Sequence, residues 1–315
     1  MARKRWYWMG GTLLLALFGG VMAHGLVTLA AYGCFSTADD VIAVDIPEPA
    51  DGVVRFVALG DTGTGNRAQR DVAGAARRVC QEQGCDFVAL LGDNFYGGGL
   101  PSAESNRYQK LIDRHYGVIG KPIVAVLGNH DLEGELKAQV MASLRNPQWR
   151  MPNYRYAFRV GTARFFATNT NCGALEWVRL ARVLERGAPG WTFVLGHHAV
   201  HGTEQHGDSD PTSEEVWDWL IEPHVDFSLA GHNHVLELLD EPGYRTHYVV
   251  AGTSGGARSR APEGGREFLP SEARSLFFSP VPGFVWMSVA PDSVRTVFYD
   301  AKAQPLFEFT NHKAP

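Results

Sequence analysis

The chain has 315 residues, of which 45% are hydrophobic and 20% charged, a composition typical of a globular protein with an ordinary core. Its formal net charge is −5 at pH 7. Because residues 1–38 carry three positive charges and no acidic ones, residues 39–315 carry a net charge of about −8. A surface of that sign argues against nucleic acid as a partner, since nucleic-acid binding requires a basic face.

The first 38 residues form a basic head followed by a long uncharged stretch. The basic triplet at residues 3–5 is the last set of charges before Asp39. Such a stretch is long enough to span a membrane, which takes about 20 residues, whereas the apolar core of a cleaved signal has about 7–15. The head would stay in the cytoplasm and the rest would be exported. Three outcomes remain open: a membrane-anchoring uncleaved signal, a secreted or periplasmic protein after cleavage at Ala23, or lipidation at Cys34.

A repeating order of short apolar runs and helical stretches follows the N-terminal segment. Residues 39–52 are acidic and contain proline, which predicts a linker leading into a domain at 53–315. The apolar runs, each followed by glycine and polar residues, are 53–59, 87–91, 123–127, 191–195 and 225–230. Their nearly continuous apolar character is typical of strands buried on both faces. Helical patterns occur at 66–83, 105–119, 174–186 and 213–222. This alternation predicts parallel strands in a layered α/β architecture.

The C-terminal part changes character. Four short strand-like runs lie at 246–256, 284–290, 294–301 and 305–310, without long helices between them, and predict antiparallel hairpins. Residues 253–280, rich in Gly, Arg and Ser, are expected to form a long loop.

The four cysteines contain no CxxC pair and no zinc-ribbon spacing. Cys80 and Cys85 could form a disulfide in an oxidising compartment, but two buried thiols agree equally well with the sequence.

Metal-binding residue types follow all five buried runs. They are Asp61, Asp93, Asn129 with His130 and Asp131, His197 with His198, and His232 with His234. Ligands of open α/β sheets bind just outside the carboxyl ends of the strands, so these side chains are expected at one rim. Carboxylate, amide and imidazole together suit borderline or hard metal ions. Six donor residues are enough for two ions about 3.5–4 Å apart that share one carboxylate.

The ordered motifs GD, GDN, GNHD, GHH and GHNH resemble the signature of the calcineurin-like metallophosphoesterases. Over residues 53–310 the chain is similar to purple acid phosphatases of the small tartrate-resistant type. The resemblance implies an α/β/β/α sandwich of two mixed sheets flanked by helices, with a binuclear metal site at the carboxyl ends of the strands. The first motif departs from many relatives, because Gly63 stands where they carry a histidine ligand. Tyr96 stands where the purple acid phosphatases place a tyrosinate instead.

The resemblance also implies a set of metal ligands. On a ferric ion it places Asp61, Asp93, Tyr96 and His234. On a second metal, which is iron, zinc or manganese, it places Asp93 as a bridge together with Asn129, His197 and His232.

Other histidines receive different roles. His130 is expected to be catalytic, binding phosphate and protonating the leaving alkoxide, with Asp131 fixing its tautomer. His206 resembles a family histidine that contacts the substrate from a loop. His198 and His201 are expected behind the ligands or at the surface. Ala199 replaces the family's usual proline, which leaves the rigidity of that loop undefined.

The function implied by the resemblance is an acid phosphatase that hydrolyses a small phosphate monoester by direct attack of metal-activated hydroxide. A phosphodiesterase, nucleotidase or pyrophosphatase of the same fold is the alternative. A redox protein that uses an iron pair, or a binding protein with structural metals, would belong to a different class.

Overall fold

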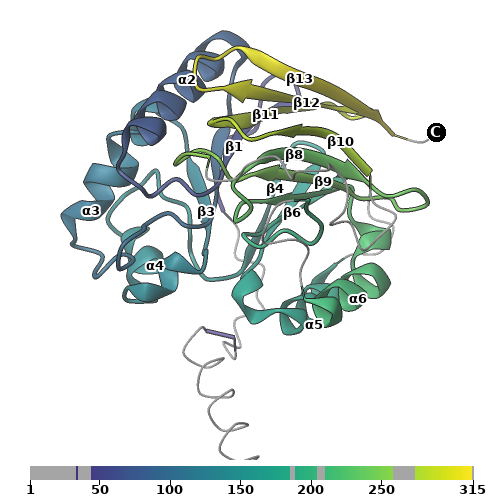
Figure 1. The fold of residues 1–315 in the computed structure, drawn as a ribbon, viewed down its shortest axis with the longest axis horizontal. Coiled ribbons are helices and arrows are strands. Elements are labelled where there is room, and N and C mark those ends of the chain that lie inside the picture. Colours follow the sequence, from purple (N-terminus) through teal and green to yellow (C-terminus); the bar gives the residue numbers. More distant parts are fainter. Residues whose placement is uncertain (1–32, 35–43, 185–188, 204–209, 258–273, 314–315) are drawn as a thin grey trace, which may run out of the picture.

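Two β-sheets face each other and carry helices on their outer sides (Figure 1). The computed structural model describes residues 33–34, 44–184, 189–203, 210–257 and 274–313. Within those ranges the architecture is the predicted α/β sandwich of two mixed sheets.

The first sheet has six strands in the order β13-β12-β11-β1-β2-β3. Their bounds are β1 Val54–Leu59, β2 Phe87–Leu91, β3 Ile123–Val126, β11 Gly283–Val289, β12 Ser293–Asp300 and β13 Pro305–His312. β1, β2 and β3 run parallel, with Val57 opposite Val88. β11 adds antiparallel to β1, and the β11-β12-β13 meander confirms the hairpins predicted for the last three C-terminal runs, whereas the run at 246–256 lies in the other sheet.

The second sheet has seven strands in the order β10-β8-β9-β7-β6-β5-β4. Their bounds are β4 Tyr156–Val160, β5 Ala163–Ala167, β6 Trp191–Leu195, β7 Phe227–Ala230, β8 Leu236–Asp240, β9 His247–Ala251 and β10 Arg274–Ser279. β10 lies within the stretch 253–280, so the prediction of an uninterrupted loop there was wrong. The strand escapes detection because it is a partly exposed edge strand, which lacks the continuous apolar character of a central strand.

The helices are α2 (Arg67–Gln83), α3 (Asn106–Tyr108), α4 (Ala138–Ala142), α5 (Ala174–Val183) and α6 (Pro211–Leu220). α2 matches its prediction: the Asn66 side chain accepts a hydrogen bond from the Gln69 amide at its start, and Gly84 ends it at φ 86°. α6 begins before the predicted Ser213, because Asp210 caps the helix and Pro211 occupies its first turn.

The single helix predicted over 105–119 is interrupted. α3 passes into a π-helical turn at Gln109–Asp113, and a separate 3-10 turn forms at Gly117–Ile119. The buried side chain of Gln69 donates to the Leu111 carbonyl at 2.6 Å, so that this carbonyl is bonded outside the helical ladder. This tertiary contact is invisible in the local sequence pattern.

Aromatic rings fill the space between the two sheets. Phe56 of β1 stacks on Phe87 of β2 with centroids 4.8 Å apart, and its edge meets Phe165 of β5 at 5.5 Å. Phe165 in turn stacks on Phe193 of β6 at 4.8 Å. This packing joins the parallel strands of both sheets and holds their carboxyl ends at one rim.

Two disulfides lie in the described residues. Cys80 is bonded to Cys85, which settles the alternative left open by the sequence. Cys34 is bonded to Cys172, 138 residues away, so lipidation of the Cys34 sulfur is incompatible with this structure. No helix of the described ranges is long and apolar enough to cross a membrane. Except for Gly33 and Cys34, the predicted N-terminal anchor lies outside those ranges.

Part of the stretch predicted as a linker contacts the domain. Val44 and Ile46 are buried in the main core, and the Glu48 carboxylate accepts a hydrogen bond from the Gly161 amide at 2.7 Å. Residues 44–53 contain no helix or strand but lie along the sandwich.

Candidate metal centre

The predicted ligands gather at the carboxyl ends of five parallel strands. Asp61 follows β1, Asp93 follows β2, Asn129 follows β3, His197 follows β6, and His232 with His234 follows β7. Asp61, Asp93 and His197 are buried within this rim. Three donor atoms, one from each of these residues, lie within 4.8 Å of one another.

One half of the site, here called the tyrosine group, consists of Asp61, Tyr96 and His234. The Tyr96 hydroxyl donates to Asp61 Oδ1 at 2.8 Å and lies 3.3 Å from His234 Nε2. His234 Nε2 is 3.2 Å from the same Asp61 oxygen. A phenol, a carboxylate and an imidazole therefore point at one place.

The position of Tyr96 depends on Gly63. The Tyr96 amide donates to the Gly63 carbonyl at 3.1 Å. A Cβ atom on residue 63 would lie 2.2 Å from the Asn94 backbone, so no side chain fits there without displacing the loop. The same close approach that forbids a histidine at position 63 brings Tyr96 to the site. Arg107 holds the loop from outside by donating to the carbonyls of Tyr96 and Gly97.

The other half, here called the histidine group, consists of Asn129, His197 and His232. His197 Nε2 lies 3.1 Å from Asn129 Oδ1, and His197 Nδ1 bonds the Leu91 carbonyl at 2.9 Å. The His197 and His232 rings meet edge to face at 5.1 Å. Because Nδ1 is directed to a backbone carbonyl, Nε2 is the nitrogen left for a metal.

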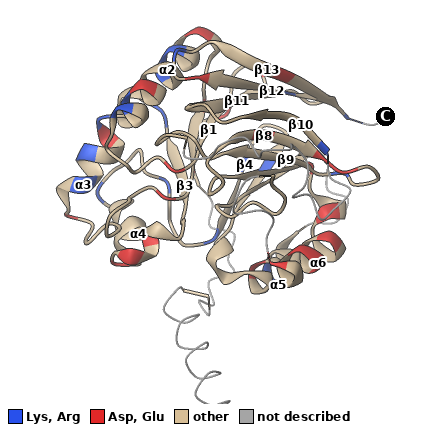
Figure 2. Cartoon of the chain, viewed as in Figure 1, with Lys and Arg blue, Asp and Glu red and all other residues tan. Residues whose placement is uncertain are grey.

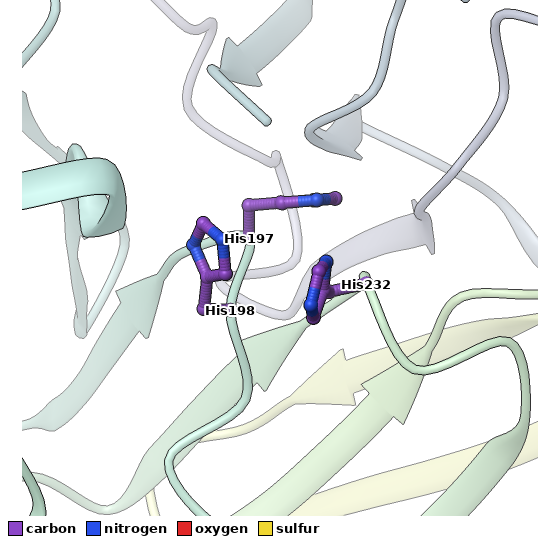
Figure 3. A group of neighbouring side chains, drawn as sticks. All are labelled: His197, His198 and His232. Carbon is purple, nitrogen blue, oxygen red and sulfur yellow. The ribbon is translucent and has the colours of Figure 1, made fainter. Parts of the chain in front are cut away.

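His198 joins this half, although the sequence analysis did not count it among the ligands. Figure 3 shows the imidazoles of His197, His198 and His232 around one small space, and one nitrogen of each lies within 4.8 Å of the others. His198 Nδ1 is 2.8 Å from the Thr170 hydroxyl, which also accepts from the backbone amides of His197 and His198. The doubled histidine in GHH was the available signal.

Asp93 lies between the two groups. Its Oδ1 is 3.5 Å from His197 Nε2 and accepts the His130 amide at 2.9 Å. Its pocket is tight, because a Cβ on Gly128 would lie 2.2 Å from the same Oδ1. The carboxylate is therefore held where both groups can share it.

Three residues of this rim adopt left-handed backbone conformations that non-glycine residues rarely take. Asp61 has φ 58°, Asp93 φ 51° and His232 φ 65°. Such strain concentrates at functional sites, where surrounding structure over-determines the backbone. Here the turn immediately after each strand bends the side chain back toward the rim.

The site favours positive charge. Burial, followed by the carboxylates of Asp61 and Asp93, raises the pKa of Tyr96 far above its ordinary value, so the phenol by itself stays protonated. Burial alone would lower the pKa of His197, but the carboxylates of Asp93, Asp61 and Asp131 and the Leu91 carbonyl together raise it. Buried carboxylates facing imidazole and amide donors fit two metal cations, since oxygen and nitrogen donors of this kind suit borderline and hard ions.

Comparison with known proteins places the chain in a family. The calcineurin-like phosphoesterase model matches residues 54–236, more than half of the chain. The chain belongs to this family. It is 28% identical to purple acid phosphatase 3 of Arabidopsis thaliana, over 81% of this chain and 76% of that protein. It is also 28% identical to tartrate-resistant acid phosphatase type 5 of Oryctolagus cuniculus, over 83% and 91%.

Solved structures agree with the fold. GAP50, described as the anchor in the inner membrane complex of Plasmodium, superposes with a TM-score of 0.71 at 20% identity, over 83% of this chain and 90% of that one. PhoD superposes with a TM-score of 0.56 at 12% identity, over 86% and 72%. As a calcineurin-like phosphoesterase, the chain is expected to hold a binuclear metal centre, and the His and Asp cluster supplies residues for it.

One predicted contact of this phosphoesterase was wrong. Asp131 does not fix the tautomer of His130, because its carboxylate accepts the backbone amides of Asn94, Phe95 and Gly128. His130 Nδ1 instead meets Glu133 Oε1 at 2.7 Å. Asp131 is buried and stabilises the turn that carries Asn129.

The remaining predicted histidines lie elsewhere. His206 falls outside the described residues. His201 is fully buried, with its ring edge against Tyr248 and with the carboxylates of Glu214, Asp218 and Glu241 3.5–3.9 Å from its nitrogens.

Proposed function

We propose that this phosphoesterase is an acid phosphatase that hydrolyses phosphate monoesters at a binuclear centre of Fe(3+) and a divalent iron, zinc or manganese. The observation that carries the proposal is the convergence of Tyr96, Asp61 and His234 on one point, with Asp93 between them and the histidine group. The acid phosphatase names of the relatives support the monoester substrate.

The two groups differ in charge in a way that supports two different ions. The tyrosine group offers a carboxylate and a phenol, which as a phenolate is a hard anionic donor for a trivalent ion. The histidine group offers an amide and neutral imidazoles, which suit a divalent ion. Such a pair of ions, when bound, would supply Lewis acidity toward phosphate oxygens. It would also lower the pKa of a bound water molecule to about neutral.

The residues around the two ions would have different roles. The Asp93 carboxylate lies between the two groups and would be shared by both ions. His197 is locked by the Leu91 carbonyl, so its Nε2 cannot rotate away from the site. His130, partly exposed at the rim beside Tyr96, is the group available to bind phosphate and to give a proton to the leaving oxygen.

The decisive experiment measures metal content and substrate preference together. Purified protein should contain two metals per chain, one of them ferric, and should show a broad visible absorption band from the tyrosinate. It should hydrolyse phosphate monoesters faster than diesters and pyrophosphates. Faster turnover of a diester would replace the monoester proposal with the alternative, and a protein with two metals but no hydrolysis would overturn it.

We also propose that the domain is exported and that the N-terminal segment tethers it to a membrane unless it is cleaved. The two disulfides support this proposal, because structural disulfides persist in oxidising compartments. A membrane-impermeant protease added to cells stripped of their wall and any outer membrane should digest the tethered domain. Protection of the domain under conditions where a known surface protein is cut would contradict export.

A further inference from the structure

His130 and Glu133 form a pair at the edge of the metal centre. His130 Nδ1 lies 2.7 Å from Glu133 Oε1, and Glu133 Oε2 accepts the backbone amide of Gly98 at 2.8 Å. Both carboxylate oxygens are therefore engaged, one by the imidazole and one by the loop that follows Tyr96. The carboxylate is fixed at two points instead of hanging free from the surface.

The local backbone explains why Glu133 takes this place and Asp131 does not. Residues His130–Glu133 form a 3-10 turn. Side chains three residues apart in such a turn lie one above the other, whereas adjacent side chains point about a third of a turn apart. Glu133 therefore stands over His130, and Asp131 turns inward to the backbone amides.

The pair defines a tautomer. The Gly98 amide, followed by His130, lowers the pKa of Glu133, so its carboxylate is ionised and only accepts hydrogen bonds. Nδ1 of His130 must then carry the hydrogen in this contact. The ring also packs at 4.6 Å against the ring of Tyr96, which limits its rotation from the other side. Nε2 is the nitrogen left for the substrate.

We infer that Glu133 is a positioning residue, which holds the His130 imidazole with Nδ1–H toward itself so that Nε2 serves the leaving-group oxygen. This inference rests on the proposed phosphatase function. In the reaction, hydroxide forms the new bond to phosphorus as the ester P–O bond breaks. The reacting His130 is the doubly protonated ring, whose Nε2 proton passes to the departing alkoxide, so the products are an alcohol and phosphate and the ring is left as the Nδ1–H tautomer.

A merely structural role is the competing explanation, because Glu133 also holds Gly98. The two roles separate in a double-mutant cycle of Glu133→Ala and His130→Ala. Loss of the partner that orients a metal-binding histidine typically costs about 10–100-fold, and we expect a similar factor for a histidine that donates a proton. Glu133→Ala should therefore slow an alkyl phosphate by that factor and nitrophenyl phosphate by less, because nitrophenolate leaves without a proton. In the His130→Ala background the same change should have almost no further effect.

Matched variants test the contact itself. Glu133→Gln keeps one carbonyl oxygen for Nδ1–H and should recover part of the rate lost in Glu133→Ala. Glu135 lies two residues further along and is exposed, with its carboxylate on the Lys137 amide, so Glu135→Ala removes the same charge and should leave the rate unchanged. Metal content and the visible band should stay the same in all three variants.

A readout independent of catalysis is the tautomer of His130. Nitrogen NMR of the metal-free protein should show hydrogen on Nδ1 in the wild type, and the other tautomer should gain population in Glu133→Ala. An unchanged tautomer, or rate losses that multiply in the double variant, would overturn the positioning role even in an active enzyme. A wild type that binds two metals without hydrolysing monoesters would reject the proposed function. In that case the tautomer measurement would still show whether Glu133 orients the His130 ring.

Discussion

The tyrosine group and the histidine group are built in different ways. In the tyrosine group the donor atoms of Asp61, Tyr96 and His234 contact one another within 3.3 Å. In the histidine group the side chains are fixed from behind, His197 by the Leu91 carbonyl and the neighbouring His198 by the Thr170 hydroxyl. The first arrangement gathers carboxylate and phenol oxygens at one point, and the second presents amide and imidazole donors in preset directions. The difference indicates that the two metal positions should respond separately to mutation.

The largest effect is expected from Asp93→Asn, because this carboxylate serves both groups. Losing even an outer partner of a metal ligand typically costs 10–100-fold, so this variant should lose at least about 100-fold in activity together with both metals. Elemental analysis and initial rates on a monoester check this. Asn tolerates the left-handed backbone at this position, so the substitution should not itself impair folding. Two retained metals and a near-normal rate would refute the bridging role.

Asn129→Ala should affect only the histidine group. We expect the divalent metal to bind about 10–100-fold more weakly while the ferric metal and its visible band remain. Titration of the second metal into the variant, followed by activity, measures the change. Parallel loss of both metals would show that the two positions are not independent.

Tyr96→Phe should affect only the tyrosine group. The ring still fills its space, but the oxygen is gone, so the visible band should disappear and the remaining iron should be easier to reduce. Absorption spectra and a reductive titration check this, with a smaller loss of activity expected than for Asp93→Asn. Tyr108→Phe is the matched control, since Tyr108 is buried with its ring against Trp149. A band that persists in Tyr96→Phe would mean that another residue supplies the phenolate.

The smallest effect on chemistry is expected from replacing Cys34 and Cys172 by serine. Cys172 ends the turn Thr170–Cys172, and Thr170 supports the histidine group, so any loss should fall on the divalent metal. By loop-closure entropy, closing so long a loop contributes about 5 kcal/mol, and the free energy of unfolding should drop by up to that amount. Chemical denaturation measures it.

Serines at Cys80 and Cys85 provide the control for that experiment. These residues are only five apart, and loop-closure entropy predicts a loss about 3 kcal/mol smaller than for the long loop. Equal losses in the two double variants would show that loop length does not control the stabilisation.

The strand ends and the ligands that follow them were predictable, because buried parallel strands carry a continuous apolar signal and deliver their next residues to one rim. The family resemblance supplied the sandwich of two sheets. Three features were not predictable, and each depends on contacts outside the local pattern. The Cys34–Cys172 bond joins residues 138 apart. Gln69, which belongs to α2, binds the Leu111 carbonyl and interrupts the helix that follows α3. β10 is a partly exposed edge strand.

The error at Asp131 has a different origin. The nearest acidic neighbour in sequence was taken as the partner of His130, whereas the 3-10 turn selects the residue three positions along. Similarly, the glycine at position 63 was visible as a missing histidine, but the reason for it lies in the Asn94 backbone that packs against it.

The left-handed backbone conformations of Asp61, Asp93 and His232 lower the stability of the fold in order to place side chains at the site. Glycine at any of them would relieve conformational strain worth roughly 1–3 kcal/mol, while removing a side chain that we propose as a metal ligand. Without metal, such glycine variants should therefore unfold at higher denaturant concentrations than the wild type. With metal the order should reverse, because an ion that binds only the folded wild type adds its binding free energy to stability. Selection for robustness alone would erode these three positions, whereas a requirement for the proposed metals would keep them.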